Sequence, residues 1–301
     1  MIIIKLAGGL GNQMFQYAFG KSVSISQKKD LYLDTFELNT EKDSHRKDEL
    51  TLFNTEYKTL DKNYINFGYS PLQFIIFYIK KTLKIFPFTI IQERKMKDIF
   101  YDKIDKYSGW FNYHSEIGKK IKKSKKDCYC IGFWQSYKYF EKERELLLKE
   151  FSPKQPPNEK NKQLLKIIKD KNSISIHIRR GDYTNKYHGI LSEKYYKDAI
   201  NYFNKRYKNT TFIIFSNEIQ RCRKNLSIHN GIYVDRNTTH ESYRDIILMS
   251  KCKHNIIANS SFSWRGAWLN TNPEKIIIAP QEWFQVPIDT EDLLPKERIK
   301  I

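Results

Sequence analysis

The stretch SISIHIRRGDY, Ser173 to Tyr183, decides the fold of this chain. Its isoleucines alternate with serines, His177 and Arg179, which is the period of a β-strand with one apolar face. His177 and Arg179 therefore project from the same face, about 7 Å apart along the strand. Arginines at the end of a buried strand are costly unless an anion meets them. The stretch predicts either an anion site at this strand end or an internal pair with Asp182 that closes the loop.

Further short apolar runs follow this strand, separated by helical patterns, at 212–215, 232–234, 255–258 and 276–279. Strands alternating with helices predict a doubly wound parallel sheet, in which ligands sit at the carboxyl ends of the strands. Those ends carry Arg179-Arg180, Ser216-Asn217 and Asn259-Ser260-Ser261, a cationic and hydroxylic set that suits a phosphate. A helix expected from Ser261 to Leu269 would add its terminal amides, although capping alone is the alternative reading of the serines.

The N-terminal half opens with the same kind of unit. An apolar strand at 2–6 leads into the turn Gly8-Gly9-Leu10-Gly11, a helix is expected from Met14, and a second strand ends in Asp34. Glycines at such a turn let the backbone approach a ligand. An NAD-binding fold is one alternative, but the third glycine of its fingerprint is missing, and no Lys-Ser or Lys-Thr follows the turn at the spacing of a P-loop.

A proline-rich segment, Ser152 to Pro157, interrupts a charged helix expected at 137–151 and predicts an interdomain linker. The chain has 301 residues, more than one core usually serves. We therefore expect two domains, at 1–155 and at 156–301, each of the Rossmann-like α/β class.

The chain is strongly basic, with 53 Lys and Arg against 34 Asp and Glu and a formal charge of +19. This excess favours an anionic partner, which could be nucleic acid, a membrane surface or a phosphorylated substrate. The segment Leu72–Phe88 combines apolar residues with lysines and fits either a core-packing helix, the commoner case, or peripheral contact with an anionic membrane.

Four cysteines occur without a CxxC pair, and no DxD triplet or His-carboxylate cluster is present. The cysteines are expected to be reduced thiols, and no metal or cofactor is expected. No signal peptide is expected, because the opening apolar run is too short for one, and no apolar run of about 18 residues occurs in the sequence. These observations predict a cytoplasmic protein, with attachment to the inner face of the membrane as an option.

Three stretches together resemble one known family. They are GGLGNQMFQYA at Gly8–Ala18, HIRRGDY at His177–Tyr183 and LMSKCKHNIIANSSFSW at Leu248–Trp264. Shorter matches lie at His45–Asn54, Gly132–Ser136 and Lys275–Phe284. Running in order over nearly the whole chain, they are similar to the bacterial α-1,2-fucosyltransferases, which are inverting enzymes that use GDP-fucose.

The resemblance implies a GT-B fold, in which two Rossmann-like doubly wound domains face each other across a cleft. It implies transfer of L-fucose from GDP-fucose to the 2-hydroxyl of a terminal galactose in surface glycan synthesis, without metal. A fucosyltransferase of another linkage is the alternative within this chemistry. A binder of anionic membranes or nucleic acid is the alternative from another class, although the motifs favour the enzyme and no nucleic-acid partner.

Carried over to this chain, the resemblance makes Arg179 the pyrophosphate ligand, with His177 beside it and Asn12 reaching toward the fucose. Asp245 resembles the acid that receives the N1–H and amino group of guanine. The other implied donor contacts are Gly9, Gly11, Arg180, Asp182, Asn259, Ser260, Ser261 and Ser263.

The chain departs from the family pattern at two tryptophan positions, which are Arg265 and Arg298 here. It also has Asn217-Glu218 where the family commonly has two aspartates. Arginine in place of a packing ring could weaken the helix behind the phosphate site. A catalytic base is not assigned, and Asp182 and Glu218 are the open candidates.

Overall fold

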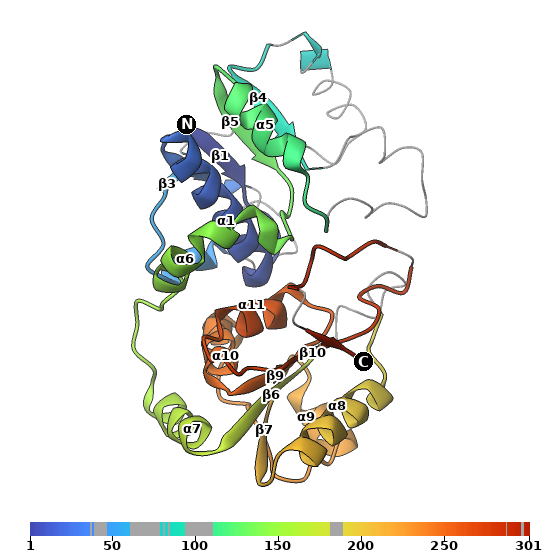
Figure 1. The fold of residues 1–301 in the computed structure, drawn as a ribbon. Coiled ribbons are helices and arrows are strands. Elements are labelled where there is room, and N and C mark those ends of the chain that lie inside the picture. Colours follow the sequence, from blue (N-terminus) through green and yellow to red (C-terminus); the bar gives the residue numbers. More distant parts are fainter. Residues whose placement is uncertain are drawn as a thin grey trace. The chain divides into compact units, whose positions relative to one another are not determined.

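A computed structural model describes residues 1–36, 38, 47–60, 79–80, 82–83, 85–93, 111–180, 189–286, 288–295 and 298–301. By its internal contacts the chain forms two compact units, coloured blue to green and yellow-green to red in Figure 1. The N-terminal unit comprises Met1–Ser152 and Glu291–Leu293, and the C-terminal unit comprises Pro153–Thr290 and Leu294–Ile301. Each unit contains its own parallel sheet with helices, so the predicted α/β fold class is confirmed.

The sheet of the N-terminal unit has the strand order β3-β2-β1-β5-β4, and all of its strand pairs are parallel. Its strands are β1 (Ile2–Lys5), β2 (Leu31–Asp34), β3 (Lys58–Thr59), β4 (Phe88–Gln92) and β5 (Asp127–Ile131). The central strand β1 is an apolar run because parallel strands are covered on both faces, and Ile2, Ile3 and Ile4 are all buried.

Helix α1 (Leu10–Gln27) connects β1 to β2 and begins earlier than the predicted start at Met14. Gly9 is its N-cap with an extended backbone, so Gly11 already belongs to the first turn. Further along, Gly20 lets the helix lie close to the sheet, since a Cβ there would stand 2.6 Å from Ile4 Cγ1. Gly20 thus fills the packing role that dinucleotide fingerprints give to their third glycine.

The rest of the N-terminal unit is built from short elements. They are η1 (Glu49–Leu52), α5 (Ser115–Lys123), η2 (Tyr137–Tyr139), η3 (Glu141–Glu143) and α6 (Arg144–Glu150). The single helix expected at 137–151 is therefore wrong. Phe140 leaves helical geometry at φ −140° and buries its ring 5.9 Å from that of Phe15, so tertiary packing overrides local propensity.

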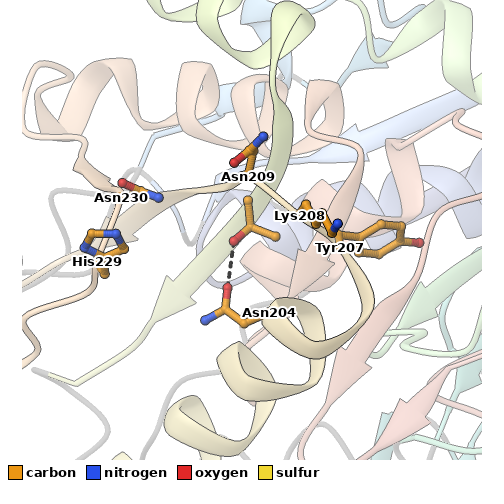
Figure 2. A pocket seen from close by; sticks show the side chains of 7 residues that line it. Asn204, Tyr207, Lys208, Asn209, His229 and Asn230 are labelled. Atoms are coloured by element: carbon orange, nitrogen blue, oxygen red, sulfur yellow. Dashed lines mark hydrogen bonds between the residues drawn. The ribbon is translucent and has the colours of Figure 1, made fainter.

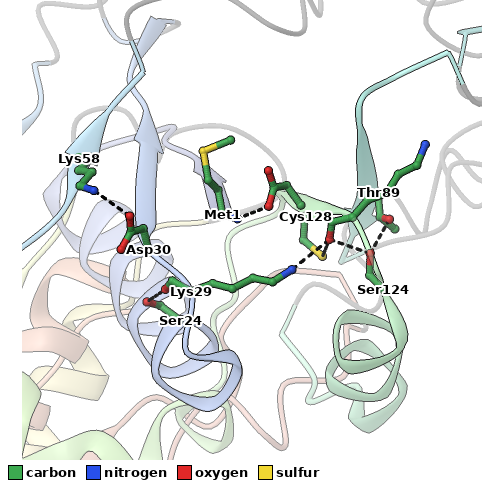
Figure 3. A network of polar contacts seen from close by, with 10 residues as sticks. Met1, Ser24, Lys29, Asp30, Lys58, Thr89, Ser124 and Cys128 are labelled. Carbon is green, nitrogen blue, oxygen red and sulfur yellow. Dashed lines mark hydrogen bonds and ion pairs between the residues drawn. The ribbon is translucent and has the colours of Figure 1, made fainter.

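Polar contacts tie the amino edge of this sheet together (Figure 3). Lys29, after α1, donates to the carbonyl of Lys126 at 3.2 Å, and the Ser124 hydroxyl donates to the same carbonyl at 3.1 Å. The hydroxyls of Ser124 and Thr89 lie 2.6 Å apart and link α5 to β4. These contacts fix the amino ends of the strands, which leaves the opposite edge for a ligand.

The sheet of the C-terminal unit has the strand order β11-β10-β9-β6-β7-β8, again with parallel pairs throughout. Its strands are β6 (Asn172–Ile178), β7 (Thr210–Ser216), β8 (Gly231–Tyr233), β9 (His254–Ile256), β10 (Ile277–Ala279) and β11 (Ile299–Lys300). Counted from β6, the order is 6-5-4-1-2-3, which is the Rossmann order read from the other edge. The doubly wound sheet predicted for this half is confirmed.

Helices cover both faces of this sheet, with α8 and α9 on one side and α10 and α11 on the other (Figure 1). The isoleucines of β6 contact Tyr196 and Phe203 of α8 in the main core, as the period-two pattern predicts. The helices are α7 (Glu159–Asp170), α8 (Glu193–Arg206), α9 (Ile219–Asn225), α10 (Ser242–Lys251) and α11 (Ser261–Leu269), with a 3₁₀ turn η5 (Thr239–Glu241).

All four cysteines are buried free thiols, as expected. Cys128 and Cys130 lie on β5 of the N-terminal unit, whereas Cys222 and Cys252 lie in the C-terminal unit. Burial raises the pKa of Cys130 well above its ordinary value and also raises that of Cys252. These thiols are therefore unreactive while the sheets are intact.

Candidate functional site

The topological switch point of the C-terminal sheet lies between β6 and β9. The chain leaves β6 toward β7 on one side and leaves β9 toward β10 on the other, so the two connections diverge. Ligands of such sheets bind in the crevice outside these carboxyl ends. The crevice is bordered here by Arg179 after β6 and by the turn Asn259–Ser261 after β9.

His177 connects the two sides of this switch point. Its imidazole is buried on β6, with the ring centroid 5.5 Å from that of Phe262 on α11. Burial, followed by the charge of Arg179, lowers the pKa of His177 to about 3, so the ring is neutral. Among the residues described, its buried Nδ1 has no hydrogen-bond partner, which is the condition of a group that awaits a ligand.

In the turn into α11, the predicted serines and asparagine lie in different surroundings. Ser260 caps the helix by accepting a hydrogen bond from Phe262 N at 3.4 Å, and Ser261 is the half-buried first helical residue. The Ser263 hydroxyl is fully buried against the backbone of Ala258 and Ser260. Ser261 therefore lies at the helix end, where a phosphate would meet free amides, and Ser263 supports the turn.

Asn259 also supports the turn. Its side-chain amide donates to the carbonyl of Trp283 at 3.1 Å and to that of Gly189 at 3.3 Å. Both contacts join the switch point to the segments that flank it. The structure thus places Asn259 beneath the crevice as a connection between loops.

Arg180 follows Arg179 but interacts with the end of β7. Its backbone amide donates to Asn217 Oδ1 at 3.2 Å, and its Nε lies 3.7 Å from Glu218 Oε2. The predicted partner Asp182 lies outside the described residues. Glu218, an open candidate for the base, is in this structure an ion-pair partner of an arginine.

Asp245 stands in the first turn of α10, at the same carboxyl edge. It is half-buried, and the side-chain amide of Asn237 donates to its Oδ1 at 2.6 Å. Burial raises the pKa of Asp245 to about 7, while the bond from Asn237 and the charge of Arg236 lower it. A carboxyl group with a pKa near 7 at a sheet edge can accept hydrogen bonds from the edge of a nucleobase.

The N-terminal unit places its candidate residues at the carboxyl ends of the adjacent strands β1 and β5. Gly8 there has a left-handed φ of +78°, and a Cβ on it would stand 2.6 Å from Asn12 Nδ2. Asn12 Oδ1 accepts a hydrogen bond from Gln135 Nε2 at 2.8 Å, so the orientation of Asn12 is fixed by the segment that follows β5. A Cβ on Gly9 would meet nothing within 4 Å, which leaves room for a ligand to approach the backbone.

Glutamines that the sequence reading did not single out hold the glycine turn in place. Gln13 donates to the carbonyls of Gly8 at 3.1 Å and Lys47 at 2.9 Å. Gln16 accepts from Ala7 N at 3.1 Å and donates to the carbonyl of Gly132 at 3.0 Å. Both glutamines lie close to the glycines on the helix that starts at the turn, and this spacing could have identified them from the sequence.

A buried acid, Glu93, lies at the end of β4 and was also missed. Its Oε2 accepts hydrogen bonds from the backbone amides of Phe133 at 2.8 Å and Trp134 at 2.9 Å. Trp134 has a left-handed φ of 55°, which a non-glycine residue rarely adopts. Burial raises the pKa of Glu93 to about 8. Glu93 thus fixes the turn that presents Gln135 to Asn12.

The departures at the tryptophan positions have structural counterparts. Arg265 is fully buried in α11, with its guanidinium carbon 4.9 Å from the ring centre of Trp264 and 5.3 Å from that of Trp268. Arg298 donates to the carbonyls of Leu294 and Pro295. Arg265 therefore packs on aromatic rings through cation–π contacts rather than facing solvent.

A cavity of about 400 Å³ lies at the opposite edge of the C-terminal sheet (Figure 2). It is lined by the end of α8 and the residues that enter β7 and β8, including Asn204, Lys208 and His229. Thr210 Oγ1 donates to Asn204 Oδ1 at 2.7 Å on its wall. This edge is remote along the strands from the switch point.

The described part of the chain contains neither a metal-ligand cluster nor a membrane-spanning helix. There, no three His, Cys, Asp or Glu side chains gather as a metal ion would require. No helix in that part is long and apolar enough to cross a bilayer. Most of the segment Leu72–Phe88 lies outside the described residues, and peripheral membrane contact is not supported.

Two parallel α/β units, one with the Rossmann order and an arginine at its switch point, are typical of nucleotide-binding folds of the GT-B class. Residues 1–299 match the model of Glycosyl transferase family 11, and the chain belongs to that family. The family predicted from the motifs is thus confirmed. Membership of this family argues against an NAD-dependent enzyme and against a protein that only binds nucleic acid or membranes.

Similarity to known proteins extends over the whole chain. An α-1,2-colitosyltransferase of Escherichia coli is 35% identical over 314 residues, covering 100% of this chain and 99% of the relative. Galactoside α-(1,2)-fucosyltransferase 1 of Rattus norvegicus is 27% identical over 152 residues, covering 46% and 40%. The solved structure of Arabidopsis thaliana FUT1 in complex with GDP has a TM-score of 0.51 at 10% identity, covering 94% of this chain and 71% of that one, which is a likeness of fold.

Proposed function

We propose that this chain transfers L-fucose from GDP-fucose to the 2-hydroxyl of a terminal galactose, with inversion, in surface glycan synthesis. The observation that carries the proposal is the meeting of Arg179, the buried imidazole of His177 and the start of α11 at one switch point. Arginine and a helix N-terminus are the groups that bind a pyrophosphate. Membership of the family and the two curated relatives support the reaction class.

Arg179 is assigned to the donor pyrophosphate. As the bond between fucose C1 and the β-phosphate oxygen breaks, negative charge grows on that oxygen, and a fixed guanidinium stabilises the transition state more than the ground state. The neutral His177 offers a hydrogen bond instead of a second charge. Because arginine and helix amides neutralise the leaving group, the proposed reaction uses no metal and no cofactor.

The galactose 2-hydroxyl attacks C1 from the face opposite the departing GDP, so the new C1–O bond forms as the bond to the β-phosphate oxygen breaks, the configuration inverts, and the hydroxyl proton passes to solvent water. We assign the donor to the C-terminal domain, 156–301, with Asp245 at guanine and Ser260 and Ser261 at phosphate. The N-terminal domain, 1–155, is the acceptor side. Its Gly9, Gly11 and Asn12 are proposed to meet the sugar end of the donor.

The test is Arg179→Lys in the full chain. Lysine keeps the charge but loses the planar fork, so we expect kcat to fall about 10²–10³-fold with an unchanged thermal midpoint. Arg206→Lys is the matched control, since Arg206 is exposed at the far end of α8. A kcat for Arg179→Lys within twofold of wild type would overturn the assignment.

Colitosyl transfer is a second candidate, because the relative matched over the full chain is a colitosyltransferase. Colitose is fucose without its 3-hydroxyl, so the two donors differ by one hydrogen-bonding group. We expect kcat/KM to be higher with GDP-fucose than with GDP-colitose on a panel of galactosides, and the product to show an α-1,2 linkage by NMR. A higher value with GDP-colitose reassigns the donor, and another linkage in the product reassigns the regiochemistry.

A further inference from the structure

Three side chains form a hydrogen-bonded relay between separate segments of the C-terminal unit. Asn161 Nδ2, on α7, donates to Asn237 Oδ1 at 2.8 Å, and Asn237 Nδ2 donates to Asp245 Oδ1 at 2.6 Å. Asn161 is only 1% exposed although it is polar, which is unusual for a residue near a helix start. The relay ends on the carboxylate proposed to meet guanine.

The relay is itself held in place at its far end. Asn161 N donates to Asn158 Oδ1, the cap of α7, at 3.0 Å, and Arg236 Nη1 donates to the carbonyl of Lys160 at 2.8 Å. An amide has one donating and one accepting end, so the bond from Asn161 to Oδ1 turns Nδ2 of Asn237 toward Asp245. The loop after β8 and the first turn of α7 therefore form one fixed support.

We propose that Asn237 is a positioning residue for Asp245: the side-chain amide of Asn237 fixes the plane of the carboxylate and favours its ionised form, which the guanine edge requires. Guanine presents two parallel donors, N1–H and N2–H, and a carboxylate must lie in their plane to accept both. Oδ1 can accept a second hydrogen bond beside that of Asn237. This inference rests on the proposed use of a GDP-linked donor.

The protonation of Asp245 depends on the charged groups around it, so the role of Asn237 can be measured through the pH dependence of binding. Burial raises its pKa to about 7, Asn237 and Arg236 lower it, and Glu241 raises it slightly. Arg244 on the same helix is paired with Glu241 at 3.0 Å. The relay residue from α7 is uncharged, and Arg265 of the adjoining α11 lies over tryptophan rings. Asp245 is therefore about half protonated at neutral pH. The loss of one hydrogen bond then changes the protonated fraction strongly.

The experiment measures the Kd of GDP by calorimetry from pH 5.5 to 9, using the full chain. Wild type is expected to bind more tightly as pH rises, levelling off above about pH 8 as Asp245 becomes ionised. Asn237→Ala is expected to bind about tenfold more weakly at pH 6.5 and to approach wild type at pH 9, because the midpoint moves upward. Since the terminal phosphate of GDP also titrates, the difference between variants is the readout.

Further variants separate positioning from folding. Asn161→Ala, which removes only the bond that orients the Asn237 amide, should move the midpoint in the same direction by less. Asn204→Ala removes a comparable bond at the opposite sheet edge (Figure 2) and should leave the pH profile unchanged. Thermal midpoints identify any variant that fails to fold.

The outcomes distinguish this inference from the function on which it rests. An Asn237→Ala protein that binds GDP like wild type from pH 5.5 to 9 overturns the positioning role, and one whose pH profile keeps the wild-type midpoint overturns the effect of Asn237 on the ionisation of Asp245; both outcomes leave the GDP site intact. Asp245→Asn should bind weakly with no contribution from this group to the pH profile. If wild type does not bind GDP, or Asp245→Asn binds as wild type does, the proposed function fails and the role of Asn237 fails with it.

Discussion

At the scale of single residues, Glu93 shows how a buried acid can serve a backbone. Its carboxyl group accepts two amide hydrogen bonds from a turn that includes the left-handed Trp134. The side chain is 5% exposed, so its charge is poorly solvated. The turn leads directly to Gln135, the partner of Asn12. Stability and the proposed acceptor side are therefore linked through one titrating group.

Glu93→Gln should change how stability depends on pH. The pKa of Glu93 is about 8 in the folded chain and about 4.3 when unfolded, so between these values only the folded state holds the proton. Stability of wild type then falls with rising pH by up to about 1.4 kcal/mol per unit in this window. A glutamine side chain keeps an oxygen that can accept the two backbone hydrogen bonds, and it has no titrating proton.

Urea unfolding at pH 5, 6.5 and 8, followed by tryptophan fluorescence, measures this effect. We expect Glu93→Gln to gain on wild type steadily from pH 5 to 8. Glu116→Gln, at an exposed position of α5, is the control and should parallel wild type. Parallel curves for Glu93→Gln as well would contradict the raised pKa.

The strand that carries His177 was predicted correctly, because its isoleucines alternate with polar residues and β6 spans Asn172–Ile178. In the structure, His177 on this strand lies beside Phe262 of α11. The roles of Glu93 and Asn237 were not predicted, because they arise from contacts with residues far away in sequence. Nothing in the local pattern around either residue distinguishes it from a surface polar residue.

At the scale of elements, the packing of α1 on its sheet depends on a glycine inside the helix. At Gly20, a Cβ would approach Ile4 and Leu31 to 2.6 and 2.8 Å. Gly20→Ala should therefore destabilise the N-terminal unit by about 1–3 kcal/mol, the usual result of overpacking. Thermal or urea unfolding measures the change.

Gly118 in α5 is the matched control. It is exposed and a Cβ there would meet nothing within 4 Å, so Gly118→Ala should stabilise by up to about 1 kcal/mol through helix propensity. If both substitutions had the same sign, close helix–sheet packing would not explain Gly20.

Elements with strong local signals were predicted well, and others were not. The helix Ser261–Leu269 was placed at its observed bounds because a serine cap precedes an apolar run. Helix α7 was missed because its sequence is mostly polar and follows a proline-rich segment. The two-residue strand β11 forms only by pairing with β10, which no local pattern reveals.

At the scale of the whole molecule, the formal charge of +19 should act on capture of the donor. A positive field raises the association rate of an anionic ligand and is screened by salt. The association rate of a fluorescent GDP analogue should fall about tenfold between 50 and 500 mM NaCl, measured by stopped flow. A neutral galactoside should show no such change in KM. A salt-independent association rate would mean that the charge has no part in capture.

The four buried thiols allow the opening of each unit to be followed by the rate at which its own cysteines react. Cys128 and Cys130 can react with a thiol reagent only when the N-terminal sheet opens, and Cys222 and Cys252 only when the C-terminal unit does. Mass spectrometry of the labelled peptides would time the two openings separately in one sample. If the donor belongs to the C-terminal domain, GDP should slow labelling of Cys222 and Cys252 and leave the other pair unchanged. Equal protection of both pairs would instead mean that the two units open together.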